Sequence, residues 1–276
     1  MRRERKPSNA GSVAHPTGTS CGRHWPPNAS AGRRAVRALA HFLLPRCCVT
    51  CDARLPEGAS DLACGTCWSR LPMLPNPQCP RCGYPLADGA CRWCDLLPPY
   101  VRAVRSVCWV PDGLGGELVH ALKYDGWHAL AAGLGARMAR LSWPPDVAAE
   151  RTALVPVPLS TRRERERGFN QSARLADAIG GCLGLAVWRD VLIRTNFTSS
   201  QTRLTPEERL RNVSGAFRVT GDPTRLRGAH LVLVDDVVTT AATLNACAAA
   251  LFAGGSRIIS YVTFGRARLP GDAPLQ

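Results

Sequence analysis

Two adjacent carboxylates and a run of hydroxyl side chains offer the clearest chemistry in this sequence. Asp235 and Asp236 follow a short apolar run, Leu231–Val234, which is typical of a buried parallel strand. The hydroxyl-rich turn Val237–Thr243 comes next and opens an Ala-rich segment that predicts a helix to about Ala253. Ligands of open α/β sheets bind at the carboxyl ends of strands, and a helix N-terminus offers free N–H groups to an anion. This arrangement suits a phosphorylated ribose, although a plain capped turn is the alternative interpretation.

The order strand, Asp-Asp, Val-Val-Thr-Thr-Ala-Ala-Thr, helix resembles the signature with which type I phosphoribosyltransferases bind phosphoribosyl pyrophosphate (PRPP). The resemblance implies that Asp235 and Asp236 act on the ribose as the catalytic pair. That signature usually has Gly where this chain has Ala241, and Gly permits a positive φ and a close approach to phosphate. We therefore expect phosphate affinity to depend on this position. The expected PRPP-binding residues of the loop are Val238, Thr239, Thr240, Ala241, Ala242 and Thr243.

Transfer from PRPP also needs cations for the pyrophosphate, together with Mg²⁺ held largely by PRPP oxygens and water. The segment Ser160–Arg167 follows a strand that ends in VPVP and alternates Arg with Glu. We expect it to be a pyrophosphate loop that acts through Arg162, Arg163 and Arg167, because the guanidinium fork fits phosphate oxygens. A solvated helix start with charges that screen one another is the alternative.

Four C-x-x-C pairs lie between residues 47 and 94, and this spacing lets two thiolates bind one zinc ion. They predict two structural sites of four thiolates each, with zinc supplying the folding free energy of a segment poor in apolar residues. Neighbouring pairs could share a metal, or alternate pairs could do so in a cross-braced arrangement. Cys47 is a spare thiol that could replace Cys48. The expected ligands are Cys48, Cys51, Cys64, Cys67, Cys79, Cys82, Cys91 and Cys94.

The composition limits the possible settings of the protein. The chain has 276 residues, a net charge of +14 and 13 cysteines. No apolar run reaches the length of a membrane span, and no signal peptide is evident, so we expect a cytoplasmic protein. The basicity favours polyanion binding, although a bias toward Arg would give the same charge. Lys123 is the only lysine after Lys6, which could mark a required point charge or arise by chance.

Three regions are predicted along the chain. Residues 1–46 form a basic disordered tail with a short amphipathic helix near its end, and a misassigned start codon would give the same composition in the tail. Residues 47–98 form the zinc-binding module. Residues 99–276 form a third region, which contains the Asp235–Asp236 motif. In the third region, strands are expected at 101–110, 152–158, 187–193, 215–219, 229–234 and 257–264. Helices are expected at 114–124, 127–141 and 169–183, and from Thr205. This alternation predicts an α/β fold with a doubly wound, mainly parallel sheet.

Several motifs together resemble the ComF family of competence-associated proteins. They are LKYDG, VPVPLSTRRERERGFNQSARLA, SSQTRLTPEERLRNVSGAF and LVLVDDVVTTAATL, behind the cysteine module. The resemblance implies a type I phosphoribosyltransferase-like domain behind a zinc module. It also implies a role with internalised single-stranded DNA in natural transformation, with PRPP, that DNA and competence-machinery proteins as expected partners. It does not indicate an acceptor. The further site residues implied are Lys123, Asn170 and Gln171, with Gln201 and Arg203 in a lid over the site.

Three functions are compatible with these patterns. The first is a PRPP-dependent glycosyltransferase, and the second is a sensor that binds PRPP or a nucleotide without turnover. The third is a DNA-binding competence factor whose zinc module and Arg-rich surface carry the function. Ala241 favours the second, whereas the paired cysteines and the charge favour the third. PRPP binding and DNA binding are compatible, so we keep them together.

Overall fold

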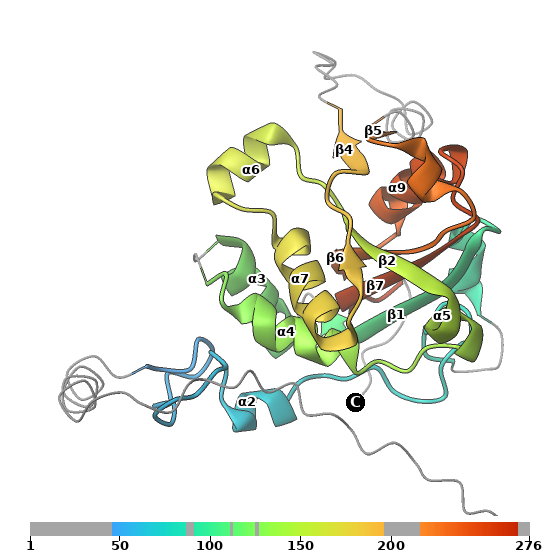
Figure 1. Cartoon of the computed structure of the whole chain (residues 1–276). Helices are drawn as coiled ribbons and strands as arrows, with labels where there is room; N and C mark the ends of the chain where they lie inside the picture. Colours follow the sequence, from blue (N-terminus) through green and yellow to red (C-terminus); the bar gives the residue numbers. More distant parts are fainter. Residues whose placement is uncertain (1–45, 87–90, 111–112, 125–126, 196–215, 270–276) are drawn as a thin grey trace, which may run out of the picture.

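The computed structural model describes residues 46–86, 91–110, 113–124, 127–195 and 216–269 (Figure 1). Within them, a five-stranded sheet forms the centre of the molecule and helices cover both of its faces. The amphipathic helix expected in the tail, the helix expected from Thr205, and the lid residues Gln201 and Arg203 lie outside the described residues. None of the helices in the described ranges is long and apolar enough to cross a bilayer.

The central sheet has the order β1-β7-β6-β2-β3, and every neighbouring pair in it is parallel. Two short strands, β4 and β5, pair with each other in a separate antiparallel sheet. The strand expected at 187–193 is therefore two strands of different sheets. The strands are β1 (Val101–Val110), β2 (Arg151–Pro156), β3 (Ala186–Val187), β4 (Leu192–Arg194), β5 (Phe217–Val219), β6 (His230–Val238) and β7 (Ile258–Ala267).

Helices α3, α4 and α7 cover one face of the sheet, and α9 covers the other. Side chains of β6 alternate accordingly: Leu231 and Leu233 belong to the core on the α9 side, whereas Val232 and Val234 belong to the core on the α3 side. The expected doubly wound, parallel α/β fold is confirmed. The helices are α2 (Gly65–Ser69), α3 (Gly113–Tyr124), α4 (Leu130–Ala139), α5 (Pro145–Glu150), α6 (Thr161–Arg167), α7 (Gln171–Leu183) and α9 (Ala242–Ala253), with short 3₁₀ helices at Arg92–Leu96 and Pro223–Leu226.

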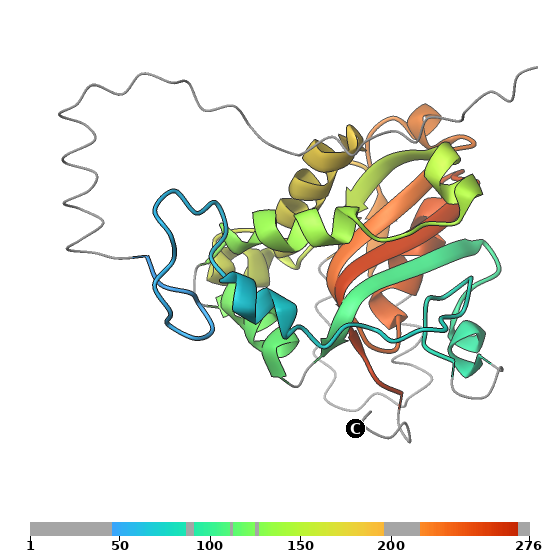
Figure 2. The ribbon, with the colours of Figure 1, turned by 90° about the horizontal axis from the view of Figure 1, so that it is seen from below.

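The two halves of the cysteine module pack on opposite faces of this sheet (Figure 2). The first half, residues 46–70, lies against α4, where the Arg137 guanidinium stacks 3.2 Å from the ring centroid of Trp68. Arg137 also forms an ion pair with Asp61 at 3.2 Å. Gly133 of α4 leaves room for this contact, since a Cβ there would lie 2.5 Å from the Asp61 carboxylate. The first half is therefore closely fitted to the helical face.

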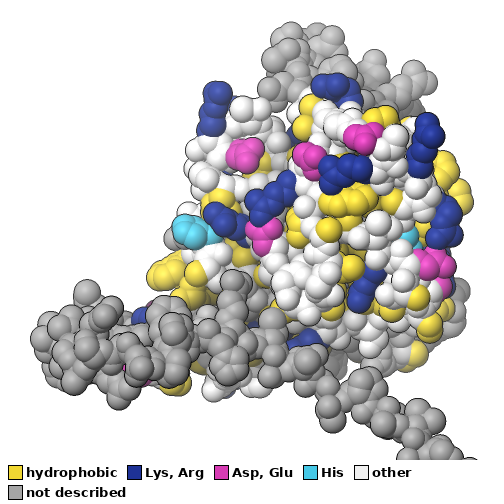
Figure 3. Space-filling model, in the orientation of Figure 1, with side chains coloured by type: hydrophobic (Ala, Val, Ile, Leu, Met, Phe, Trp, Pro, Cys, Tyr) yellow, Lys and Arg dark blue, Asp and Glu magenta, His cyan; other side chains and the backbone are white. Residues whose placement is uncertain are grey.

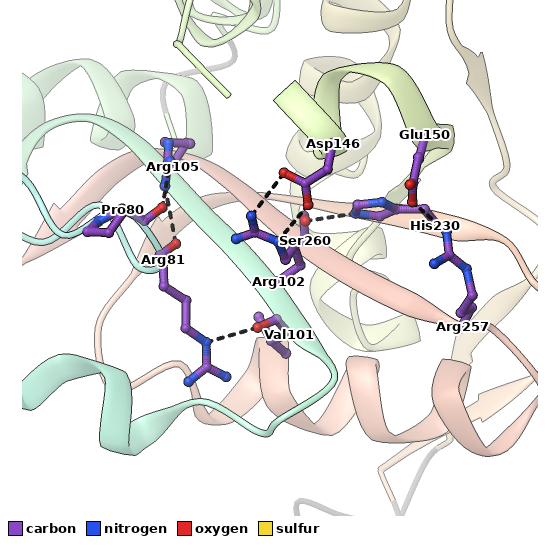
Figure 4. A network of polar contacts seen from close by, with 10 residues as sticks. All are labelled: Pro80, Arg81, Val101, Arg102, Arg105, Asp146, Glu150, His230, Arg257 and Ser260. Atoms are coloured by element: carbon purple, nitrogen blue, oxygen red, sulfur yellow. Dashed lines mark hydrogen bonds and ion pairs between the residues drawn. The ribbon is translucent and has the colours of Figure 1, made fainter. Parts of the chain in front are cut away.

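The second half of the module is tied to β1 through its backbone (Figure 4). Arg105 donates to the carbonyl oxygens of Pro80 at 2.9 Å and Arg81 at 3.2 Å. Arg81 in turn donates to the carbonyl oxygen of Val101 at 3.1 Å. Gly83, two residues after Arg81, faces β1. Its φ is +67°, and a Cβ added there would lie 2.7 Å from the Val104 carbonyl oxygen. This glycine is required for the close approach of the two backbones.

Candidate functional site

The loop between β6 and α9 has the strand–turn–helix form that the sequence predicts. The strand continues through Asp235 and Asp236 to Val238, four residues beyond its expected end at Val234. Helix α9 begins at Ala242, and Ala241 precedes it with a φ of 60° and a ψ of 7°. Ala241 therefore adopts the left-handed conformation that favours glycine, at a cost of about 1–2 kcal/mol. Its methyl group is buried.

The loop exposes hydroxyl groups around the N-terminus of α9. Thr239, Thr240 and Thr243 are exposed, as is Ala242, whereas Val238 is buried. The first backbone N–H groups of a helix have no acceptor within the helix. Together with the positive end of the helix dipole, these groups form a surface suited to a phosphate.

Asp235 is buried and held from two directions. The Ser172 hydroxyl at the start of α7 donates to Asp235 Oδ1 at 2.8 Å, and the backbone N–H of Asp236 donates to the same oxygen at 2.9 Å. Burial raises the pKa of Asp235 well above its ordinary value, and the neighbouring charge of Asp236 raises it further. This carboxyl group therefore lies inside the fold, where it orders the end of β6.

Asp236 has a different environment although it is the next residue. It is also buried, and its Oδ2 atom forms an ion pair with Lys123 Nζ from the last turn of α3. Lys123, which the sequence marks by its rarity, thus lies at the acidic pair. Asp236 also lines a pocket, whereas Asp235 does not.

The segment expected to form a pyrophosphate loop is helical instead, so that prediction is wrong in conformation. Ser160 caps α6 by accepting from the Arg163 N–H at 3.3 Å, and Gly168 ends the helix with a φ of 75°. Arg162 and Arg163 are exposed, and Arg162 pairs with Glu166 at 2.7 Å one turn away. Local capping and this i,i+4 pair favour the helix over a loop.

Arg167, at the end of α6, belongs to a cluster beside the acidic pair. Its guanidinium donates to Gln171 Oε1 at 2.8 Å and to the Tyr124 hydroxyl at 3.3 Å. Asn170 caps α7 by accepting from the N–H of Ser172 at 2.9 Å. The structure therefore brings Arg167 and Gln171 near Lys123 and Tyr124, and gives Asn170 a structural role at the helix start.

Two pockets border these residues. One, of about 770 Å³, lies between the first half of the cysteine module, α3 and the end of β6, and includes Asp236 and Thr239 in its wall. The other, of about 480 Å³, lies between the end of β2, α6 and the start of α7. No residue lines both pockets. The cationic residues of the second pocket are Arg174, Arg189 and Arg194.

The eight paired cysteines gather into two groups of four, and within each group all sulfur atoms lie within 4.8 Å of one another. Sulfur–sulfur distances of 3.7 Å for Cys48–Cys67 and for Cys51–Cys64 match the spacing of about 3.8 Å in a zinc tetrathiolate with 2.3 Å bonds. In the second group, Cys79–Cys94 and Cys82–Cys91 are separated by 3.5 Å and 3.2 Å. Neighbouring C-x-x-C pairs therefore share each site, and both sites fit structural Zn²⁺. Cys48 is a member of the first group, and Cys47 is not.

A buried arginine lies beside the second group of cysteines. Arg266 of β7 is fully buried, and its guanidinium stacks 4.4 Å from the ring centroid of Trp93 and 5.7 Å from that of Tyr84. Burial lowers its pKa to about 10, which leaves it charged at neutral pH, while negative charge on Cys82 acts in the opposite direction. A zinc tetrathiolate has two net negative charges, so Arg266 supplies a buried counter-charge to this site.

Sequence reasoning missed three of these residues: Ser172, Tyr124 and Arg266. Ser172 lies within the motif VPVPLSTRRERERGFNQSARLA, and its place in the first turn of a helix facing a strand end is a usable signal. Tyr124 is adjacent to Lys123 within the recognised LKYDG motif. Arg266 lies within β7, two residues beyond the strand end expected at Phe264, and has no local signal, because its neighbour Cys82 is distant in the sequence.

Comparison with known proteins places the chain in a family. A family model described as a double zinc ribbon domain matches residues 39–97. The DNA utilization protein YhgH of Salmonella typhimurium is 33% identical over 226 residues, which cover 78% of this chain and 95% of that protein. Competence protein ComFC of Bacillus subtilis is 29% identical over 229 residues, covering 75% and 89%. A solved glutamine PRPP amidotransferase from B. subtilis is 16% identical over 49% of this chain and 26% of that one, with a TM-score of 0.34. On the extent and identity of the match to YhgH, and with the two zinc sites in place, the chain belongs to the ComF family of competence and DNA utilization proteins.

Proposed function

We propose that the protein binds PRPP with Mg²⁺ at the loop between β6 and α9, and that it acts on or with internalised single-stranded DNA. The observation that supports PRPP binding most is the buried acidic pair at the end of β6, directly before the exposed threonines at the N-terminus of α9. The helix terminus suits the 5′-phosphate, and Asp236 suits the ribose hydroxyls.

In this proposal the two acidic residues have different roles. Asp236 would exchange its contact with Lys123 for the ribose hydroxyls, which frees the lysine to meet the negative charges of PRPP. Asp235 would stay inside the fold and hold the loop through Ser172. Arg167 would supply a cation for the pyrophosphate from the end of α6. The exposed Arg162 and Arg163 would contribute long-range attraction at most.

Calorimetric titration of PRPP in the presence of Mg²⁺ tests this proposal. Asp236→Asn should weaken binding by about tenfold or more, because hydrogen bonds to a charged group contribute about 1.5–3 kcal/mol. Asp146→Asn is the matched control, since Asp146 lies before the N-terminal end of β2 and forms a partly exposed ion pair with Arg102. Absence of PRPP binding by the wild type would refute the proposal.

The role with DNA rests on the family and on the charge of the chain. The net charge is +14, and the face shown in Figure 3 has Lys and Arg side chains spread over it, with acidic ones between them. Binding through phosphate contacts should weaken steeply as salt rises, because each contact releases a counterion. Fluorescence anisotropy of a labelled single-stranded oligonucleotide over a salt series measures this slope. A flat response would contradict phosphate-mediated binding.

Turnover is a separate question from binding, and Ala241 favours a sensor that binds without turnover. Its backbone holds the left-handed conformation in which glycine is usual, and its methyl group is buried in the core on the α9 side of the sheet. A screen of purines, pyrimidines and amines for pyrophosphate release distinguishes an enzyme from a sensor. Release with any acceptor would establish a glycosyltransferase.

A further inference from the structure

The second pocket, of about 480 Å³, has no part in the proposed binding of PRPP. It lies between the end of β2, α6, the start of α7 and β4, and we call it the α6 pocket. Its volume lies within the range of about 300–1,000 Å³ that is usual for small-molecule sites. Figure 3 shows basic side chains, with acidic ones between them, on the face where Figure 1 places α6, α7 and β4.

Three arginines from different segments meet in the wall of the α6 pocket. Arg174 belongs to α7, Arg194 belongs to β4, and Arg189 lies in the connection from β3 to β4. Glu164 is the one acidic residue among the described residues that line the pocket. Because guanidinium groups bind phosphate oxygens through paired hydrogen bonds, this excess of positive charge favours a phosphate group as the ligand.

The three arginines differ in the contacts that they already make. Arg189 forms an ion pair with Asp177 of α7, and the Arg194 guanidinium lies 5.4 Å from the ring centroid of Phe217. Within the described residues, no hydrogen bond or ion pair holds the guanidinium of Arg174, and this residue is exposed. A ligand can therefore bind Arg174 without displacing an existing partner.

Apolar side chains lie in the same wall as the arginines. Phe169 is half-buried and meets His128 edge-on, with the ring centroids 5.3 Å apart. Leu159 and Ile193 are also half-buried and add apolar surface. A nucleobase has a flat face that stacks on such surfaces, so a wall with both arginine and aromatic side chains fits a nucleotide better than an inorganic phosphate ion.

The connection between α6 and α7 separates the α6 pocket from the acidic pair. On one side of it, the Ser172 hydroxyl donates to Asp235 at 2.8 Å. On the other side, Gly168 and Ala173 line the pocket together with Arg174. Since the pocket uses none of the residues to which the proposed function gives a contact with PRPP, both ligands can be bound at the same time.

We propose that the α6 pocket is a second anion site, which binds a nucleotide through its phosphate. Arg174 and Arg194 bind the phosphate oxygens, and the base lies against Phe169. The nucleotide is free or part of a single strand, because both sources present the same phosphate and base. This inference goes beyond the proposed function, since the pocket does not need PRPP in order to bind its ligand.

Calorimetric titration with thymidine 5′-monophosphate tests the site, in the presence of saturating PRPP and Mg²⁺ so that the loop between β6 and α9 is occupied. Thymidine, which lacks the phosphate, should bind at least about tenfold more weakly. Arg174→Gln should weaken binding of the monophosphate by about tenfold or more, which is 1.4 kcal/mol or more, and leave PRPP binding unchanged. Arg165→Gln is the matched control, because it makes the same change of charge at an exposed position of α6 that does not line the pocket.

The outcomes separate this inference from the proposed function. Displacement of the monophosphate by PRPP would overturn the second site, as would equal affinity of the wild type and Arg174→Gln. If the wild type fails to bind PRPP, the proposed function is refuted, but the comparison of Arg174→Gln with Arg165→Gln still decides this inference. A short oligothymidylate distinguishes the two sources. Tighter binding of the oligonucleotide than of the monophosphate, weakened by Arg174→Gln, assigns the pocket to a strand, whereas the reverse order assigns it to a free nucleotide. Binding of neither would overturn the proposal.

Discussion

Arg266 offers the sharpest test of how the zinc module and the sheet depend on each other. It is fully buried on β7, its Nε–H donates to the Ser106 hydroxyl at 3.3 Å, and its guanidinium lies against the ring of Trp93. Beside it is Cys82, a ligand of the second zinc site. Arg266→Met keeps most of the apolar volume and removes the charge, so it isolates the electrostatic contribution.

The expected loss of stability follows from burial. Removing one partner of a buried charge pair costs about 3–5 kcal/mol, because the other charge is left without compensation. For a chain of this size, 1 kcal/mol corresponds to about 2–4 °C in Tm, so the zinc-loaded variant should melt about 6–20 °C below the wild type. When zinc is removed and the thiols of the site hold their protons, Arg266 has lost its counter-charge. The same substitution should then cost far less.

Thermal unfolding of zinc-loaded and chelator-treated protein measures this difference. Arg268→Met is the matched control, because the Arg268 guanidinium stacks 4.4 Å from the ring centroid of Trp109 and belongs to neither cysteine group. Zinc transfer to a chromophoric chelator gives an independent readout, and the variant should lose about 10–100-fold in affinity at one of its two sites. An equal fall in Tm with and without zinc, together with unchanged zinc affinity, would show that Arg266 acts by packing alone.

Three further predictions concern the candidate site and the metal. Because folding raises the pKa of Asp235, its bound proton stabilises the fold at acidic pH, and that stabilisation is lost as pH rises through the raised pKa. Asp235→Asn should therefore raise Tm at pH 8 and flatten its pH dependence, since the amide stays neutral; a lower Tm at pH 8 would contradict this. Ala241→Gly should tighten PRPP binding, as measured by calorimetry. The free energy of unfolding should change little, because the relief of about 1–2 kcal/mol of backbone strain offsets both the greater chain entropy of glycine in the unfolded state and the loss of a buried methyl group. Equal PRPP affinities would show that the methyl does not obstruct phosphate. Cys48→Ser should lower the zinc content by one ion in metal analysis, whereas Cys47→Ser should leave two; the reverse result would reassign the ligand.

The features that sequence reasoning found are those with a local signal. A C-x-x-C pair fixes two ligands within one turn of backbone, so the eight zinc ligands follow from spacing alone. Continuous apolar runs identify buried parallel strands, as for β6 and β7, and their alternation with helices predicts the doubly wound sheet. The positive φ of Ala241 agrees with the glycine that is usual at that place, although the sequence led only to the expectation that phosphate affinity depends on this position.

The features that sequence reasoning missed depend either on contacts between distant segments or on a small energy difference between two local conformations. Alternating Arg and Glu after Ser160 suit either a loop or a helix, and the cap with one i,i+4 pair selects the helix α6. The short strands β3 and β4 have too few residues to show a periodic pattern, so the sequence analysis predicted one strand at 187–193 in place of the two. No local pattern places Ser172 on Asp235 or Arg266 beside Cys82, since each pairing arises from the order of strands in the sheet.

The cysteine module is integral to the sheet, because it closes an edge that the sheet leaves open. Strand β1 is the outer strand, and an unpaired edge exposes N–H groups that invite pairing with another chain. Here the N–H of Val104 donates to the Arg81 carbonyl oxygen at 3.0 Å, and the N–H of Trp109 donates to the Pro72 carbonyl oxygen at 2.8 Å. The two zinc-binding halves also cover opposite faces of the sheet, and the first half forms part of the wall of the pocket beside α3. Metal binding should therefore stabilise the β1 edge of the sheet, the packing on both of its faces and this pocket wall. Loss of zinc should therefore disturb the candidate ligand site even though no cysteine of either group lines it.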